Sequence, residues 1–291
     1  MLVQRILSKN LETKNLNNEI RQVAYLGPPG TFTEQAAVSS YPSALLLPYP
    51  SIGDSALAVL KNEADAALCP IENSLQGAVT DTLDALLHQE GLHIRGELAL
   101  KIEHTLMAKP GTTIAQVERI YSHPQALGQC RKYLSALENI ELAAALSTAG
   151  AVNDALNSDI PAAAIAPIRA ADLYGATVLK KGIQDDNNNY TRFVVLSKND
   201  SPSTGNDLTS IAISFSEDRA GQLFSVLKEF AARNINLTKI ESRPTRLGLG
   251  KYYFLMDFEG HRTDTEIIKL LNIISTQASL MKILGSYPRR H

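Results

Sequence analysis

Tryptophan is absent from this 291-residue sequence, and cysteine occurs only at Cys69 and Cys130. The two cysteines are far apart and lie among apolar neighbours, which argues against a disulfide framework or a zinc site. The six histidines show no metal-ligand spacing. His104 and His123 stand near motif-like stretches, and we expect both to be hydrogen-bonded structural residues. The sequence therefore predicts neither a metal nor any other cofactor.

Strong charge of either sign and long apolar runs are also lacking. A formal net charge of −2 argues against a nucleic-acid or anionic membrane surface. No apolar run reaches membrane-spanning length, and residues 1–21 are too polar for the apolar core of a signal peptide. We expect a cytoplasmic protein whose partners are small molecules.

The composition is that of an ordinary globular chain, 44% hydrophobic and 20% charged, long enough for two or three domains. Residues 1–21 are read as an extension without assigned function. Residues 22–198 alternate short apolar strands with helical patterns, and the long extended stretch 93–108 can cross between two lobes. Residues 199–208 have linker composition. Residues 209–286 follow the order βαββαβ of a ferredoxin-like sandwich.

The first polar stretch, residues 27–34, follows a short apolar strand. Thr31 and Glu34 have capping-box spacing, which predicts a helix start with free backbone N–H groups. The letters GPPGT also open the phosphate loop of many ATPases, but Phe32 and Thr33 stand where that loop requires Lys and Ser or Thr. We reject nucleotide binding. A site for a substrate carboxylate and a plain strand-to-helix turn both remain open.

A second polar group follows the apolar strand at residues 66–69. Glu72, Asn73 and Ser74 place a carboxylate, an amide and a hydroxyl directly beyond a buried strand. Such groups are expensive to place there unless they are hydrogen-bonded or in use. The stretch 70–82 therefore favours a functional site.

Two more expected helix starts carry hydroxyl groups. Ser122 and Gln125 have capping-box spacing, with a buried stripe predicted at Leu127, Cys130, Leu134 and Leu137. Ser147 and Thr148 precede the third such helix.

The stretch from residue 187 to 196 is the one on which the interpretation of the whole chain depends. Three asparagines lead into Tyr190, Thr191, Arg192 and an apolar run. Thr191 and Arg192 should sit where a loop becomes a strand, a place from which a rigid sheet presents side chains to a cleft. The alternative is an edge strand, with Thr191 chosen for β propensity and Arg192 as solvated surface.

Taken together, residues 27–33, 70–82, 122–130 and 189–193 resemble the four signature stretches of prephenate dehydratases. The C-terminal part resembles an ACT regulatory domain, with residues 221–224 and 241–244 in the places of its two phenylalanine-binding motifs. The resemblance covers roughly residues 22–286. It implies an α/β catalytic domain of two lobes, similar to type 2 periplasmic binding proteins, with the active site between the lobes. Residues 1–21 leave no room for the chorismate mutase domain of some relatives, so we expect the monofunctional arrangement.

The resemblance implies a carbon–oxygen lyase of L-phenylalanine biosynthesis that converts prephenate to phenylpyruvate with loss of water and CO2. It also implies inhibition by L-phenylalanine through the ACT domain and a homodimer or homotetramer. The implied catalytic residues are Thr191, Glu72, Asn73, Ser122 and Gln129. The implied substrate-binding residues are Thr31, Ser74, Ser147, Thr148, Arg192 and Phe193. The implied effector-binding residues are Gly221, Gln222, Leu223, Phe224, Glu241, Ser242, Arg243 and Pro244.

Several roles stay open on the sequence alone. An aliphatic hydroxyl is a weak acid, so we favour Thr191 as an orienting donor, with Glu72 or a water delivering the proton. Arg192 either pairs with a substrate carboxylate or, as we prefer, braces a neighbouring carboxylate. Gln222 and Phe224 are bulkier than usual for the first ACT motif, which leaves the strength of inhibition open.

Three rival functions are an arogenate dehydratase, a non-catalytic amino-acid sensor, and a prephenate decarboxylase that does not aromatise the ring. The residues Glu72, Asn73 and Thr191 speak against the sensor, and the motif around Thr191 disfavours the decarboxylase. The sequence does not decide between prephenate and arogenate.

Overall fold

The computed structural model describes residues 20–217, 219–245 and 251–290. The expected extension 1–21 thus lies outside the described residues except for Ile20 and Arg21. The chain divides into two compact units. Unit 1 spans Met1–Val79 and Ala99–Phe193, and unit 2 spans Thr80–Leu98 and Val194–His291.

The first sheet of the chain is built around a buried strand, β3. Its strand order is β2 (Leu45–Tyr49), β1 (Gln22–Leu26), β3 (Ala66–Asn73), β11 (Tyr190–Ser197) and β5 (His93–Lys101), and the short β4 (Gly77–Ala78) pairs with β3. Strand β1 runs parallel to both β2 and β3. Helices α2 (Phe32–Ser40) and α3 (Ile52–Leu60) belong to this part of the chain. We call residues 20–79 the first lobe.

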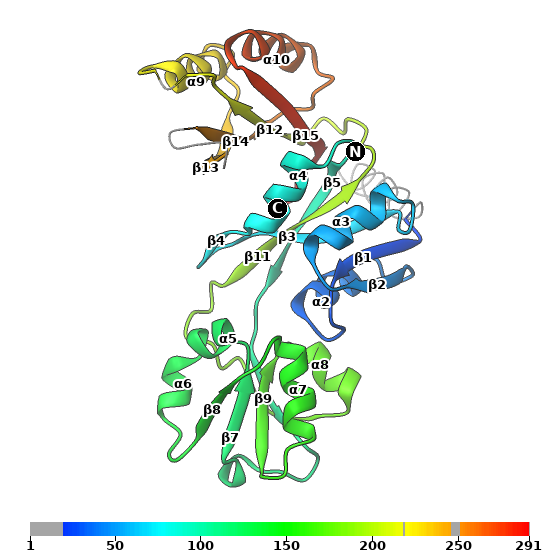
Figure 1. The fold of residues 1–291 in the computed structure, drawn as a ribbon, viewed down its shortest axis with the longest axis vertical. Helices are drawn as coiled ribbons and strands as arrows, with labels where there is room; N and C mark the ends of the chain where they lie inside the picture. Colours follow the sequence, from blue (N-terminus) through cyan, green and yellow to red (C-terminus); the bar gives the residue numbers. More distant parts are fainter. Residues whose placement is uncertain (1–19, 218, 246–250, 291) are drawn as a thin grey trace, which may run out of the picture. The chain divides into compact units, whose positions relative to one another are not determined.

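The second sheet, with its helices, makes the second lobe, residues 105–181 (Figure 1). Its strand order is β10 (Thr177–Lys181), β6 (Thr105–Ala108), β9 (Ala162–Ala166), β7 (Arg119–Ser122) and β8 (Glu141–Ala144). A short 3-10 helix, η1 (Ile114–Gln116), precedes β7. The α-helices are α5 (Pro124–Gln129), α6 (Arg131–Ser135), α7 (Thr148–Leu156) and α8 (Ile168–Tyr174).

Strand β9 shows how the second sheet is covered on both faces. Ala163 and Ile165 pack in one cluster with Cys130 of the α5–α6 region, whereas Ala162 and Ala164 pack in another with α7 and α8. Successive side chains of a strand point to opposite faces, so one run of small residues admits helices on both sides.

The chain passes between the two sheets twice. It leaves β5 for β6 through residues 102–104, and it returns from β10 to β11 through residues 182–189. The prediction that residues 93–108 cross between lobes is therefore confirmed, although two strands share the stretch. The two α/β lobes predicted from the sequence are thus present and are joined by two crossing segments.

Two local predictions in the second lobe are wrong. The single helix expected around Leu127 and Leu134 is two short helices, α5 and α6, that meet at Cys130 (φ −120°). The N-cap of α5 is His123, whose side chain accepts from the Gln125 N–H, and not the expected Ser122. The Ser122 hydroxyl instead donates to the main-chain oxygen of Ile165 on the neighbouring strand.

Unit 2 contains helix α4 (Thr80–His88) and a second α/β fold after β11. The order is β12 (Asp207–Ser214), α9 (Gln222–Ala232), β13 (Leu237–Pro244), β14 (Tyr252–Glu259), α10 (Thr265–Gln277) and β15 (Leu280–Pro288). The strands lie in the order β13-β14-β12-β15, which with βαββαβ is the predicted ferredoxin-like sandwich.

The core of this sandwich lies between its sheet and its two helices. Ile211 and Phe258 of the sheet pack with Phe230 of α9 and Leu270 of α10. Strand β12 begins two residues before the expected boundary at residue 209, and residues 241–244 form the end of β13. None of the described helices is long and apolar enough to cross a membrane.

Candidate active site

Three of the predicted site residues, Asn73, Gln129 and Thr191, are linked by hydrogen bonds where the chain crosses between the two sheets. Asn73 ends β3, and its amide nitrogen donates to Asn189 Oδ1 (2.8 Å), to Thr191 Oγ1 (3.0 Å) and to the main-chain oxygen of Tyr190 (3.2 Å). Asn73 is buried, and Thr191 is partly buried. Two motifs 116 or more residues apart are thus joined through one side chain.

The hydrogen bonds of the Asn73 side-chain oxygen fix the orientation of its amide group. Its Oδ1 accepts from the main-chain N–H groups of Leu75 (3.0 Å) and Gln76 (3.1 Å), which can only donate. The amide nitrogen must therefore be the atom that faces Thr191. Because Thr191 Oγ1 accepts this bond, the proton of its hydroxyl is directed to another acceptor.

The network continues into the second lobe. Asn189 Nδ2 donates to Gln129 Oε1 (3.0 Å), and the same oxygen lies 2.8 Å from His104 Nε2. An amide oxygen can only accept, so His104 carries its proton on Nε2. Burial lowers the pKa of His104, which keeps the ring neutral.

His104 was expected to be a structural histidine and not part of a site. Its main-chain N–H donates to Gln184 Oε1 (3.0 Å), so His104 joins the first crossing segment to the second. The signal that marks it in the sequence is its place inside the long extended stretch 93–108, directly before the second lobe.

Ser74 and Gln76 connect the first lobe to residues 188–190 and to helix α5. The Ser74 hydroxyl donates to the main-chain oxygen of Asn188 (3.0 Å) and accepts from the Tyr190 N–H (3.0 Å). The Gln125 amide nitrogen donates to Gln76 Oε1, a contact between the lobes. The β3–β4 turn is therefore fixed by the second crossing segment, by the start of β11 and by α5.

Glu72 and Arg192 form an ion pair beside this network, with 3.9 Å between Nη1 and Oε2. Their side chains are 38% and 21% exposed. This geometry agrees with the preferred interpretation of Arg192 as a brace for a neighbouring carboxylate. The exposure also leaves the carboxylate accessible from solvent.

Thr31 and Ser147 are helix N-caps, as predicted. Thr31 Oγ1 accepts from the Glu34 N–H (3.3 Å), and Ser147 Oγ accepts from the Gly150 N–H (2.9 Å). Thr148 is the first residue of α7. The capping box at Thr31 is only half formed, since the Glu34 carboxylate accepts from the Gly30 N–H (2.6 Å).

Two other candidate residues stand apart from the network. Ser122 is fully buried, and its hydroxyl donates to Ile165 O at 2.6 Å. Phe193 is 1% exposed. Their roles toward a substrate stay predictions, and direct contact through these two side chains has the least geometric support.

The first effector motif begins α9 in unit 2. Gly221 is the N-cap in a left-handed conformation (φ 87°), and a Cβ there would meet nothing within 4 Å. Phe224 is 69% exposed. A cavity of ≈ 190 Å³ opens here, lined by Phe215, Glu217, Arg219, Gly221, Gln222, Leu223, Phe224, Tyr252 and Phe254.

One side chain of the second effector motif, Arg243, contacts helix α4. Arg243 is buried, and its guanidinium contacts Asp84 Oδ1 (2.6 Å) and the main-chain oxygen of Thr80 (2.8 Å), both on α4. Glu241 pairs with Lys239 at 3.2 Å. Arg243 thus links the end of β13 to the first turn of α4.

The described residues hold no group of three His, Cys, Asp or Glu side chains that could hold a metal ion. The chain is a two-lobed α/β protein in which amide and hydroxyl groups converge between the lobes. A ferredoxin-like domain of regulatory type follows, and it has a small cavity. The sequence model of prephenate dehydratase matches residues 23–201, and that of the ACT domain matches residues 209–275. The chain belongs to the prephenate dehydratase family.

Curated relatives agree with this assignment. A bifunctional chorismate mutase/prephenate dehydratase of Neisseria gonorrhoeae is 40% identical over 269 residues, covering 91% of this chain and 74% of the relative. An arogenate dehydratase/prephenate dehydratase of Arabidopsis thaliana is 38% identical over 298 residues, covering 99% and 78%.

Solved structures share the fold over most of the chain. A prephenate dehydratase of Arthrobacter aurescens in complex with L-Phe has a TM-score of 0.84 and 37% identity, covering 92% of this chain and 90% of its own. A protein described as GqqA, a novel type of quorum quenching acylase, also has a TM-score of 0.84, with 30% identity and coverages of 93% and 98%.

Proposed function

We propose that this protein converts prephenate to phenylpyruvate, water and CO2. The observation that carries the proposal is the hydrogen bond of fixed polarity from Asn73 to Thr191. It leaves the Thr191 hydroxyl as a donor that can be aimed at a departing hydroxyl group. The family membership of residues 23–201 supports the same reaction.

The reaction balances without a redox partner. The bond between the ring and its carboxylate breaks and releases CO2, and its electron pair enters the ring. The ring expels the hydroxyl at the opposite carbon, which takes up one proton and leaves as water. Because the product ring is aromatic, the protein has to orient the leaving group and stabilise developing charge.

Thr191 stabilises the departing oxygen in this proposal. One preorganised donor is worth roughly 10²- to 10³-fold in turnover. Asn73 acts through Thr191 by donating to one lone pair of its hydroxyl oxygen. Asn189 and Gln129, the latter in the second lobe, hold the amide of Asn73 in place.

Proton delivery is assigned to a water held by Glu72. An ion pair with Arg192 requires an ionised carboxylate, which accepts hydrogen bonds and has no proton to give. The exposure of Glu72 leaves room for that water. The two carboxylates of the substrate are assigned to the helix starts at Thr31 and at Ser147 and Thr148.

Arogenate is the competing substrate, since the 38% identical relative of Arabidopsis thaliana is named arogenate dehydratase/prephenate dehydratase. The test is to incubate the purified protein separately with prephenate and with arogenate and to measure phenylpyruvate, phenylalanine and CO2. We expect stoichiometric phenylpyruvate and CO2 from prephenate. A faster reaction with arogenate would reassign the substrate, and no reaction with either would support the non-catalytic sensor.

The acylase description of one structural neighbour has no counterpart among these contacts. An acylase needs an activated nucleophile or water. In the described residues, the hydroxyls of Ser74 and Ser122 donate to main-chain oxygens.

We further propose that L-phenylalanine binds unit 2 at the start of α9 and inhibits the enzyme, as the solved complex of a relative suggests. The ACT match and the cavity beside Gly221 support this site. Helix α4 is the element that responds to bound L-phenylalanine in this proposal. Arg243 holds its first turn, and Lys282 of β15 donates to the main-chain oxygens of Leu87 (3.2 Å) and Gln89 (2.9 Å) at its end.

The chain itself connects α4 to the catalytic residues. Strand β4 directly precedes α4, and its Ala78 and Gly77 pair with Glu72 and Asn73. Asp84→Asn should weaken inhibition by L-phenylalanine about tenfold, within the usual range of allosteric coupling, with effector binding by calorimetry unchanged. Glu266→Gln removes an exposed ion pair with Lys269 elsewhere in unit 2 and is the control. Inhibition of the Asp84 variant identical to that of the unmodified protein would exclude this route.

Assembly through unit 2 is part of the same proposal. Phe224, Ile240 and Tyr252 are 69%, 47% and 43% exposed, and β13 is an edge strand. A homodimer or homotetramer would cover such residues, and light scattering will show the mass in solution. The charge and the free buried cysteines are compatible with the cytoplasm.

A further inference from the structure

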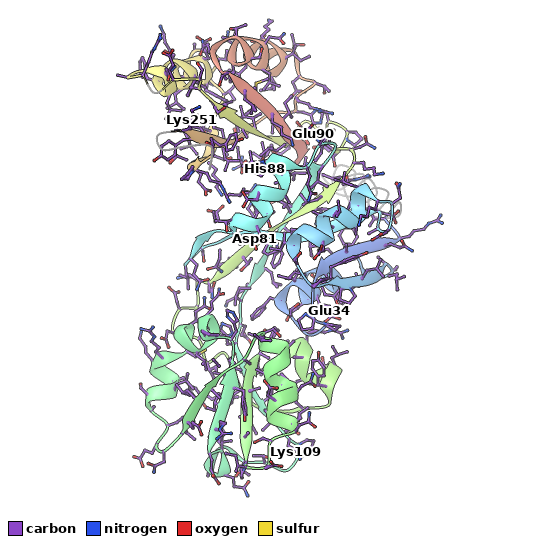
Figure 2. The ribbon with its side chains drawn as sticks, viewed as in Figure 1. Glu34, Asp81, His88, Glu90, Lys109 and Lys251 are labelled. Carbon is purple, nitrogen blue, oxygen red and sulfur yellow. The ribbon has the colours of Figure 1, made fainter. Side chains whose placement is uncertain are left out.

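Helix α8 of the second lobe contacts the stretch 29–34 of the first lobe through two side chains that the proposed mechanism does not use. The Tyr174 hydroxyl donates to the main-chain oxygen of Pro29 (2.7 Å), and Arg169 Nη2 lies 3.3 Å from Glu34 Oε1. Figure 2 marks Glu34 on α2, where this stretch approaches α8. These contacts lie within unit 1.

The Glu34 carboxylate contacts residues of both lobes. Its side chain is 7% exposed, and while Oε2 accepts from Gly30 N–H of its own lobe, Oε1 faces Arg169. A carboxylate this buried is costly unless it is paired and hydrogen-bonded. Separation of the lobes would remove its cation, so Glu34 ties the α2 start to the arrangement seen here.

Gly30 fits closely against the second lobe. A Cβ on Gly30 would come within 2.9 Å of Tyr174 Cε2 and 3.3 Å of the Cβ atoms of Ala149 and Ala170. Ala149 lies in the first turn of α7, beside Ser147 and Thr148. The turn before Thr31 is therefore held against the start of α7 by contacts that only glycine permits.

We infer that Glu34, Arg169 and Tyr174 form a latch between the lobes and act as positioning residues for the reaction. The latch holds the two helix starts, at Thr31 and at Ser147, in one fixed arrangement before the substrate binds. This inference rests on the proposed function for its catalytic consequence, but the latch itself is a property of the free protein. None of its three residues needs to touch the substrate.

The expected signature is a change in KM with little change in kcat. Without the latch the substrate must itself bring the lobes together, so the binding-competent population falls. Once the substrate is bound, the same arrangement forms and turnover proceeds at the same rate. Loss of one hydrogen bond at the latch should raise KM for prephenate about fivefold and change kcat less than twofold.

Tyr174→Phe removes only the hydroxyl of the latch. Tyr121→Phe is the matched control, since the Tyr121 hydroxyl accepts from Arg119 Nη1 (3.1 Å) within the second lobe. We expect the KM shift in Tyr174→Phe and in Arg169→Met, and not in Tyr121→Phe. A KM within experimental error of the unmodified protein in both latch variants would refute the positioning role.

A second measurement needs no substrate. Spin labels on the variant Lys61→Cys, Lys109→Cys report the distance between the first lobe and the second. The two native cysteines are buried and should not take up the label. In Tyr174→Phe we expect a broader distribution with a population at longer distance. An unchanged distribution in both latch variants would refute the latch. If the protein converts neither prephenate nor arogenate, the proposed function fails, while these distances still decide the latch.

Discussion

The polarity of the bond between Asn73 and Thr191 can be reversed by a nearly isosteric change. Asn73→Asp keeps the oxygen that accepts from the N–H groups of Leu75 and Gln76. It replaces the donor that faces Thr191 by a second acceptor. The Thr191 hydroxyl then donates to this carboxylate, and its proton is no longer available to a substrate.

The expected loss follows from the donor that is removed. Turnover at pH 8 should fall about 10²- to 10³-fold, the usual effect of one preorganised donor. The acceptor Asn189 Oδ1 also loses its donor, at a cost to the free energy of unfolding of about 1–3 kcal/mol, whereas Tyr190 O keeps the N–H of Ser74 (2.9 Å). Most domains have about 5–15 kcal/mol of stability, so the variant should remain folded and can be checked by circular dichroism.

The assay distinguishes a lost donor from general damage. Position 73 is 8% exposed, so burial should raise the pKa of the new carboxyl group, and a protonated carboxyl group can donate again. Turnover of Asn73→Asp relative to the unmodified protein should therefore recover as the pH falls, whereas Asn73→Ala should show no such recovery. Near-normal turnover of Asn73→Asp at pH 8, or identical pH profiles for the two variants, would refute the reasoning.

Three further predictions concern buried groups. Burial raises the pKa of Cys69 and of Cys130 to about 12, so a thiol reagent should label neither in the native protein and both after unfolding. The pKa of His104 is lowered in the folded state, so its contribution to stability is complete above about pH 6.5 and declines below it. Urea midpoints should fall less between pH 8 and pH 5 in His104→Gln, and an equal fall would exclude His104. Ser122→Ala should cost about 0.5–1.5 kcal/mol in urea unfolding, from the bond to Ile165 O, and should lower turnover less than Thr191→Ala.

The sequence predicted the parts of the fold that depend on local pattern. The order of strands and helices expected for residues 209–286 is that of β12 to β15 with α9 and α10. The break of one helix into α5 and α6 was missed, because Cys130 and Leu134 keep helical spacing across the break. Periodicity records which face is buried and does not record a change of backbone direction.

The candidate site was likewise predicted in part from the sequence. Asn73 was found because polar residues directly beyond a buried strand are costly without a role. Thr191 was found because it stands where a loop becomes a strand. The direction of their hydrogen bond depends on the N–H groups of Leu75 and Gln76, and only coordinates reveal that. Contacts over long sequence distances were also hidden, such as Arg243 with Asp84 and Tyr174 with Pro29.

The role of the Thr191 hydroxyl is tested most directly by steady-state phenylpyruvate formation from prephenate in Thr191→Val and Thr191→Ser, at equal folded concentration. Valine keeps the shape of threonine without its hydroxyl, and serine keeps the hydroxyl. We expect kcat to fall at least about 100-fold in Thr191→Val and less than about tenfold in Thr191→Ser. A Thr191→Val variant as active as Thr191→Ser would contradict the account.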